Sequence, residues 1–237
     1  MKRIFWFFPV LIVFFSCSGE TKSGYEITGS LEGDVAEGTQ VFLRKSDENM
    51  RPVPGDTTSV TNGTFQFTGD ATTHELRYIF VDGVNAAIPV ILENGSIRVI
   101  AHSDSLGAAE VTGTPQNEAY RAFVEGTRKL VARRNSINTE MQAAMQNRDT
   151  ANMTALRDEF FEFQQSAVDF EKTFIQGHSD ALISAMLVNR MLQSGSAPVA
   201  EVAELFEGLD PSLRQSALGS QIEAQIASQR VTAIGSK

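Results

Sequence analysis

The chain has 237 residues, of which 42% are hydrophobic and 21% charged, and its formal net charge at pH 7 is −9. This apolar content is enough for a hydrophobic core and excludes a globally disordered chain. The acidic balance disfavours nucleic acid and anionic lipid surfaces as partners, because both are negatively charged. The chain holds one cysteine, so it can form neither an internal disulfide nor a Cys-x-x-Cys redox pair.

The N-terminal residues 1–16 are predicted to be an export signal. Two basic residues precede an apolar run that is shorter than the ~20 residues needed to cross a bilayer. Cys17 follows a small residue and resembles the acylated cysteine of a bacterial lipobox, although Phe14 and Phe15 depart from its commonest form. We therefore expect Cys17 to carry lipid and to anchor the chain in the cell envelope, facing the periplasm, with residues 17–24 as a tether. The alternative is an ordinary signal peptide with an incidental cysteine.

Residues 25–113 are predicted to form an antiparallel β-sandwich or open barrel, because short alternating runs are separated by turn residues. Asn62-Gly63 predicts a type I′ turn joining two of these strands as a hairpin, since both of its positions need a positive φ. A second pair, Asn94-Gly95, lies between two later strands. The expected strands are 25–28, 40–44, 57–60, 64–68, 77–81, 88–92, 96–101 and 109–112.

Residues 114–237 are predicted to be a helical domain. Seven residues follow one another at alternating spacings of three and four: Met153, Leu156, Phe160, Phe163, Ala167, Phe170 and Phe174. The segment from Tyr120 to Ala144 repeats this spacing less cleanly, with Arg134 at one core position. Because only residues 146–150 separate the two segments, we expect a long antiparallel helical hairpin. The alternative is two amphipathic helices that pack on something else.

Charged residues on the two segments support this hairpin. Folding the chain about residue 149 brings Arg133 and Arg134 near Glu159 and Glu162. The same fold brings Arg128 and Lys129 near Asp169. Such exposed pairs would each contribute ~0.5 kcal/mol. This basic cluster is therefore interpreted as a packing feature rather than as a ligand site.

Further helices are expected toward the C-terminus. Residues 181–192 are apolar on nearly every side, which predicts a buried helix, with Ser179 as its N-cap. Pro198 should open the next helix, which ends at Glu207, and Asp210 should start a turn into a last helix over 213–230.

Residues that carry chemistry are scarce. His74, His102 and His178 have no second ligand at a recognised metal spacing, and no nucleophile or phosphate-loop motif is present. We therefore assign no catalytic, cofactor-binding or metal-binding residue, and whether the chain is an enzyme stays open.

Three short triplets resemble the Asp-Ser/Thr-apolar O-glycosylation pattern of envelope proteins in Bacteroidetes-type bacteria. They are Asp56-Thr57-Thr58, Asp104-Ser105-Leu106 and Asp149-Thr150-Ala151. The resemblance makes Thr57, Ser105 and Thr150 candidate modification sites.

Short segments in a fixed order carry a wider resemblance over nearly the whole mature chain. In the first half they are Tyr25-Glu26-Ile27-Thr28-Gly29, Val41-Phe42-Leu43, Asp56-Thr57-Thr58, Asn62 to Phe67 and Val90 to Gly95. In the second half they are Gln116-Asn117-Glu118, His178 to Ala181 and Leu205 to Pro211. This order resembles the N-terminal accessory region of Bacteroidetes-type thiol:disulfide interchange lipoproteins, in which an uncharacterised β-domain precedes an AhpC-TSA or thioredoxin-like module.

The C-terminal residues, from Thr232 to Lys237, look like the entry to such a redox module, which typically begins Ile-Gly-x-x-Ala-Pro-x-Phe. The resemblance implies thiol-disulfide oxidoreductase activity for the family. This sequence holds no residue onto which that catalysis could be transferred, because the redox module itself is missing. We expect a fragment of such a protein, or else an accessory module that exists alone.

Three functions are compatible with this sequence. The first is a non-catalytic envelope lipoprotein module that serves a thiol-disulfide oxidoreductase, with a thioredoxin-like domain or its redox client as partner. The second is a stand-alone lipoprotein that binds peptide or glycan through Tyr25, Phe42, Phe65, Phe67, Tyr78 or Phe80. The third is a hydrolase, for which no constellation of residues is visible.

Overall fold

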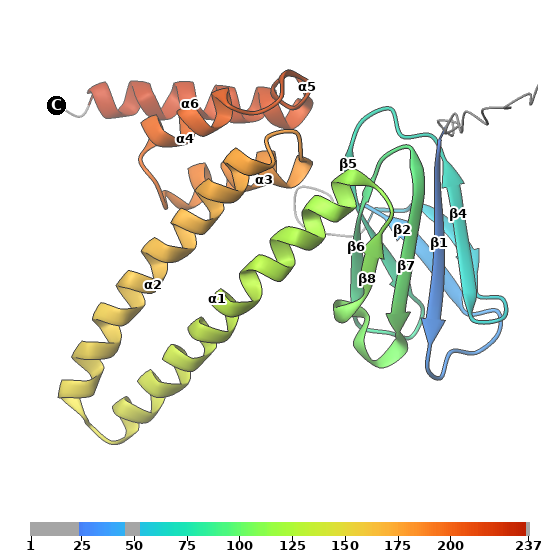
Figure 1. Ribbon diagram of the computed structural model, residues 1–237, viewed down its shortest axis with the longest axis horizontal. Helices are drawn as coiled ribbons and strands as arrows, with labels where there is room; N and C mark the ends of the chain where they lie inside the picture. Colours follow the sequence, from blue (N-terminus) through green and yellow to red (C-terminus); the bar gives the residue numbers. More distant parts are fainter. Residues whose placement is uncertain (1–23, 46–52, 236–237) are drawn as a thin grey trace, which may run out of the picture.

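A computed structural model describes residues 24–45 and 53–235 of the chain. Strands form a β-sandwich in the first half and helices make up the second half, which confirms the expected α+β class (Figure 1). The export signal, Cys17 and nearly all of the tether lie outside the described residues.

Two four-stranded sheets make up the sandwich, in the strand orders β4-β1-β7-β8 and β3-β2-β5-β6. We call these sheet A and sheet B. The strands are β1 (Tyr25–Glu32), β2 (Gln40–Arg44), β3 (Asp56–Ser59), β4 (Thr64–Gly69), β5 (Glu75–Val81), β6 (Ala87–Leu92), β7 (Gly95–His102) and β8 (Glu110–Thr112).

The core of the sandwich lies between the inner faces of the two sheets. Alternate residues along each strand point inward, so that Ile27, Val41, Ile79 and Val99 are completely shielded from solvent. The Phe65 ring fits because its partner across the ladder is Gly29, where a Cβ atom would overlap the ring.

The expected hairpin at Asn62-Gly63 is wrong, although the turn itself is present. Asn62 and Gly63 have φ angles of 51° and 72°, and Thr61 and Thr64 exchange two backbone hydrogen bonds across them. The ladder ends there, because β3 pairs with β2 in sheet B whereas β4 pairs with β1 in sheet A. The turn is therefore the corner at which the chain changes sheets.

Sheet A departs from the expected antiparallel pattern in one pairing. β1 and β7 run parallel over eight residue pairs, from Tyr25 with Gly95 to Glu32 with His102. β6 and β7 follow one another in sequence but belong to different sheets. The chain therefore crosses between the sheets at Asn94-Gly95 as well.

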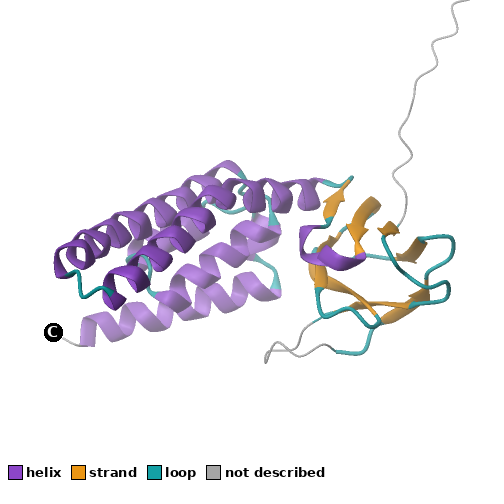
Figure 2. Ribbon diagram, turned by 90° about the horizontal axis from the view of Figure 1, so that it is seen from below, coloured by secondary structure: helices purple, strands orange, loops and turns teal. Residues whose placement is uncertain are grey.

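The helical half contains the helices α1 (Pro115–Gln146), α2 (Thr150–Gly177), α3 (Leu182–Ser194), α4 (Val199–Glu207), α5 (Pro211–Arg214) and α6 (Ala217–Gly235), and a short 3-10 helix, η1 (Ser103–Ala108), precedes β8. Figure 2 shows these helices gathered on one side of the sandwich, joined to it at the start of α1. Among the described residues, no helix is long and apolar enough to span a membrane.

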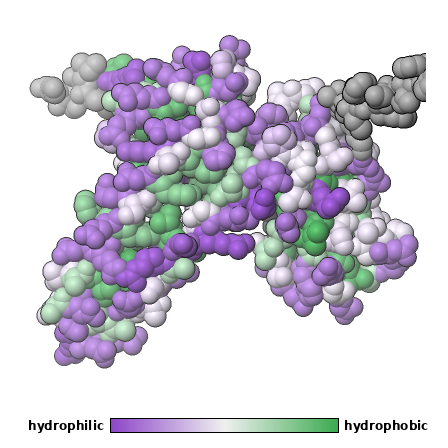
Figure 3. All heavy atoms as spheres, viewed as in Figure 1, coloured by the Kyte–Doolittle hydropathy of each residue, from purple (hydrophilic) through white to green (hydrophobic). Residues whose placement is uncertain are grey.

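The long antiparallel hairpin of α1 and α2 is confirmed. Ile137, Ala144 and Leu156 of the heptad positions are buried, and hydrophobic residues gather between the two helices in Figure 3. The connection reverses at Arg148, which has a positive φ of 54°, and Asp149 then caps α2 by accepting a hydrogen bond from the Asn152 N–H.

Charge pairing across the hairpin follows the expectation only in part. Arg133 forms an ion pair with Glu159, as predicted. Arg134 is exposed rather than covered in the seam. No ion pair joins Arg134 to Glu162, or Arg128 or Lys129 to Asp169, within the part of the chain that the structure describes.

The buried helix expected near residues 181–192 is α3, which lies against α2, α4 and α6. Eight of its residues are buried, including Ala185, Val188 and Met191 at 0% exposure. Ser179 is not its N-cap: Ala181 holds that position and makes no side-chain capping bond. The capping group comes instead from Gln116 of α1, as described below.

Candidate functional site

The junction between the sandwich and the helices is built from polar side chains at the start of α1. The Asn117 side chain accepts a hydrogen bond from the Ile91 N–H at 2.9 Å and donates one to the Ile91 carbonyl at 2.7 Å. Its amide also donates to the Thr114 hydroxyl at 2.8 Å. Asn117 therefore pairs with the free edge of β6 as a neighbouring strand would.

Gln116, the preceding residue, reaches in two further directions. Its backbone N–H donates to the Glu93 carboxylate at 2.6 Å, and its side-chain oxygen accepts from the Leu182 N–H at 2.7 Å. Its side-chain amide donates to the Asp180 carbonyl at 2.9 Å. One glutamine thus supplies the cap for α3 and ties α1 to the end of β6.

These groups are shielded from water. Glu93, Thr114, Gln116 and Asn117 are between 2% and 8% exposed. Ile91 points out of the sandwich and belongs to the hydrophobic core of the helical half. The junction is therefore a packed and hydrogen-bonded joint rather than a hinge, and we call it the Gln116–Asn117 joint.

Glu118 completes the start of α1. Its carboxylate accepts from the Gly113 N–H at 3.2 Å and pairs with Arg121 at 2.6 Å. The hydrogen bond from Arg121 and then that from Gly113 lower the pKa of Glu118 below its usual range. The carboxylate therefore stays charged at the positive end of the helix dipole, where it stabilises the first turn.

A second feature lies on the outer face of sheet B. Phe42 pairs across the ladder with Phe80, and Arg44 pairs with Tyr78, which in turn pairs with Pro89 of β6. The Arg44 guanidinium lies 4.1 Å from the centre of the Phe42 ring and 5.9 Å from that of Phe80. All five side chains are half-buried. We call this row the aromatic strip.

Of the six aromatic residues considered for a binding cleft, three are buried in the core and three lie on the outer face of sheet B. Tyr25, Phe65 and Phe67 are at most 7% exposed and belong to the sandwich core. Only Phe42, Tyr78 and Phe80 of the six lie on the outer face.

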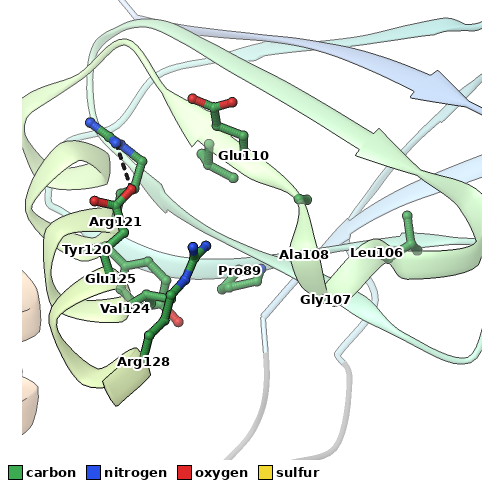
Figure 4. A pocket seen from close by; sticks show the side chains of 12 residues that line it. Pro89, Leu106, Gly107, Ala108, Glu110, Tyr120, Arg121, Val124, Glu125 and Arg128 are labelled. Carbon is green, nitrogen blue, oxygen red and sulfur yellow. Dashed lines mark hydrogen bonds and ion pairs between the residues drawn. The ribbon is translucent and has the colours of Figure 1, made fainter. Parts of the chain in front are cut away.

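The strip leads to a cavity of about 480 Å³ between α1 and the segment from Leu106 to Val111. Figure 4 shows Tyr120, Arg121 and Arg128 of α1 on one side and Glu110 on the other. The volume is in the range of small-ligand sites.

The two arginines that line this cavity differ in their ion pairs. Arg121 is held by Glu118 and by Glu125 at 2.9 Å. Arg128 has no carboxylate partner among the described residues, and its side chain extends from α1 into the space shown in Figure 4. Burial, and then the neighbouring Tyr78, raises the pKa of Tyr120, so this phenol stays protonated and able to donate a hydrogen bond.

The three candidate glycosylation sites lie far apart in the fold. Thr57 is on the edge strand β3, Ser105 in η1, and Thr150 at the first turn of α2. All three side chains are exposed. Their modification stays a prediction, as does lipidation of Cys17, which lies outside the described residues.

The histidines are spread over three elements. His74 is exposed, and His102 caps η1 by accepting a hydrogen bond from the Asp104 N–H at 3.3 Å. His178 ends α2 and stacks on Phe174 at 4.1 Å between ring centres. Within residues 24–45 and 53–235, no three or more His, Cys, Asp or Glu side chains are grouped so that they could hold a metal ion.

Residues 25–120 match the family model of a domain of unknown function, DUF4369. The match covers the sandwich and the first turns of α1, and it therefore includes both Gln116 and Asn117. No curated protein matches the chain, and no solved structure does. The match shows an uncharacterised domain over these residues, whereas the relation to thiol:disulfide interchange lipoproteins stays a prediction.

Proposed function

We propose that this chain is a non-catalytic cell-envelope module, anchored by lipid on Cys17, that holds a thioredoxin-like domain or its redox client at a fixed position. The observation that supports this proposal is the Gln116–Asn117 joint. Enzymes and binding proteins that close around a ligand bend at a few residues in loops or at the ends of elements. In this chain, the junction between the sandwich and α1 is where such a bend would occur, and it is buried and held by hydrogen bonds.

The dimensions of the helical hairpin fit a spacer. α1 has 32 residues, which corresponds to a length of ~48 Å at 1.5 Å per residue. Because α1 begins at the joint, movement of the sandwich would be transmitted along that length without a flexible link.

Cross-linking in intact envelopes tests the partner. Purification of the cross-linked full-length chain should yield adducts with proteins that contain Cys-x-x-Cys in a thioredoxin-like module. Adducts that lack such proteins altogether would count against the accessory role. The full-length chain in detergent should not reduce insulin above the uncatalysed rate. Reduction requires a thiolate as the nucleophile, and the one cysteine of the chain, Cys17, is expected to be acylated. Measurable turnover would refute a non-catalytic module.

A stand-alone binding lipoprotein for peptide or glycan is the second candidate, and the aromatic strip favours it. The reading frame downstream of Lys237 separates the two. A continuation into Ala-Pro-x-Phe and then Cys-x-x-Cys would support the accessory module. A stop codon directly after Lys237 would favour the stand-alone protein.

A further inference from the structure

Arg44 in the aromatic strip and Arg128 in the adjoining cavity have no acidic partner among the described residues. Among the described residues, no carboxylate lies within ion-pair distance of Arg44 or Arg128, although acidic residues outnumber basic ones by 29 to 20. Arg77, Arg121, Arg133 and Arg190 have such partners. Arg98 and Arg134 lack them as well within the described residues, so the position beside the aromatic strip and its cavity distinguishes Arg44 and Arg128. In an acidic chain, two unpaired guanidinium groups beside aromatic rings indicate a site for an anion.

Arg44 is positioned for this role. Its guanidinium lies over the Phe42 ring, with the central carbon 4.1 Å from the ring centre. The N–H groups on the edge of the guanidinium can hold a carboxylate through two parallel hydrogen bonds.

The rings of Tyr78 and Pro89 lie between the two arginines. Arg44, Tyr78 and Pro89 lie on three neighbouring strands, so the row spans ~10 Å at 4.8 Å per strand. The cavity that holds Arg128 begins at Pro89. Two linked sugar rings cover such a distance. Their C–H faces can pack on the aromatic rings, while their hydroxyl groups stay in water or reach Tyr120 and Glu110.

An extended peptide suits this face less well. Peptides that bind along a sheet gain their affinity by pairing their backbone with an unpaired edge strand. The strip lies across the face of sheet B, where β2 and β5 are already paired on both sides. A peptide backbone would therefore lose hydrogen bonds to water without replacement.

We infer that the aromatic strip and the adjoining cavity bind a saccharide that carries carboxylate groups. Its sugar rings pack on Tyr78 and Phe80, and its carboxylates pair with Arg44 and Arg128. This inference names a ligand class for the second candidate function and does not depend on the redox role.

Titration calorimetry of the full-length chain in detergent tests the inference, with trigalacturonate and trimannuronate as probes. At least one should bind, and its methyl ester, which lacks the negative charge, should bind at least tenfold more weakly. Arg44→Gln and Arg128→Gln should each lower affinity by about tenfold or more, as expected when a charge-assisted hydrogen bond is lost. Arg98→Gln is the matched control, because Arg98 is an exposed arginine in β7 of sheet A, and its affinity should be unchanged.

Tyr78→Leu tests the stacking surface, since it keeps an apolar side chain of moderate size but removes the ring. It should weaken binding while the melting temperature stays close to that of the wild type. Binding of neither probe, equal affinity for acid and ester, or an equal loss in Arg98→Gln would overturn the inference. Tighter binding of a tri-glutamate peptide would identify a peptide site instead and would overturn it as well.

Discussion

Replacing Asn117 by alanine should destabilise the fold strongly, because this one side chain satisfies both backbone groups of Ile91. Asn117 is 2% exposed and Ile91 is 0% exposed, so water cannot take its place without opening the joint. A buried donor or acceptor left without a partner costs about 1–3 kcal/mol. The two orphaned groups together predict a loss of roughly 2–6 kcal/mol in the free energy of unfolding.

Urea unfolding followed by circular dichroism measures this loss. Asn138→Ala is the control, because Asn138 is exposed on the same helix, and its change should stay within about 0.5 kcal/mol. Asn117→Asp keeps an acceptor for the Ile91 N–H but places a carboxylate against the Ile91 carbonyl, so it should not rescue stability. Equal stability of Asn117→Ala and Asn138→Ala would refute the reasoning.

Three further changes test other parts of the structure. Phe174→Ala should cost about 3–5 kcal/mol, because the buried ring packs edge-on against Phe123 at 5.2 Å, whereas the exposed Gln165→Ala should stay within about 0.5 kcal/mol; similar melting temperatures would contradict the packed hairpin. The lowered pKa of Glu118 contributes stability above its unfolded-state pKa that is lost as the pH falls through its folded-state pKa; Glu118→Gln should therefore lose less stability than the wild type between neutral and acidic pH, and parallel pH profiles would count against this. Cys17→Ser should move the protein from the membrane fraction to the soluble fraction or leave it unprocessed, and unchanged retention would refute lipidation.

The helical half was largely predictable, because the spacing of the heptad residues along the sequence determines which face of the helix they occupy. Phe160, Phe163 and Phe170 recur at the spacing that places them on one face, and a short connection forces the two helices together. Burial of α3 was predictable in the same way, because a helix that is apolar on nearly every side must be covered, whichever elements pack against it.

The sandwich was less predictable, since a turn does not specify how far pairing continues. Asn62-Gly63 has the turn geometry that its residues favour, yet β4 pairs with a strand that begins 39 residues before it. Alternation also shows which residues share a face without showing which face is inside. Phe42 alternates with Val41 and Leu43, and only the packed fold places the aromatic ring outside.

The joint depends on contacts that no local pattern reveals. Asn117 binds a residue 26 positions earlier, and Gln116 caps a helix that starts 66 positions later. The one available signal was two adjacent amide side chains in the first turn of a helix that starts at Pro115, where polar groups often have capping roles.

We expect the sandwich and the helices to move as one rigid unit because the Gln116–Asn117 joint connects them. Pulsed electron paramagnetic resonance tests it directly, because Cys17→Ser leaves no cysteine and allows spin labels at Ser96 of β7 and Gln165 of α2, both exposed. We predict a single narrow distance distribution, which broadens when Asn117→Ala is added. A broad or two-peaked distribution in the labelled chain that retains Asn117 would contradict the rigid joint.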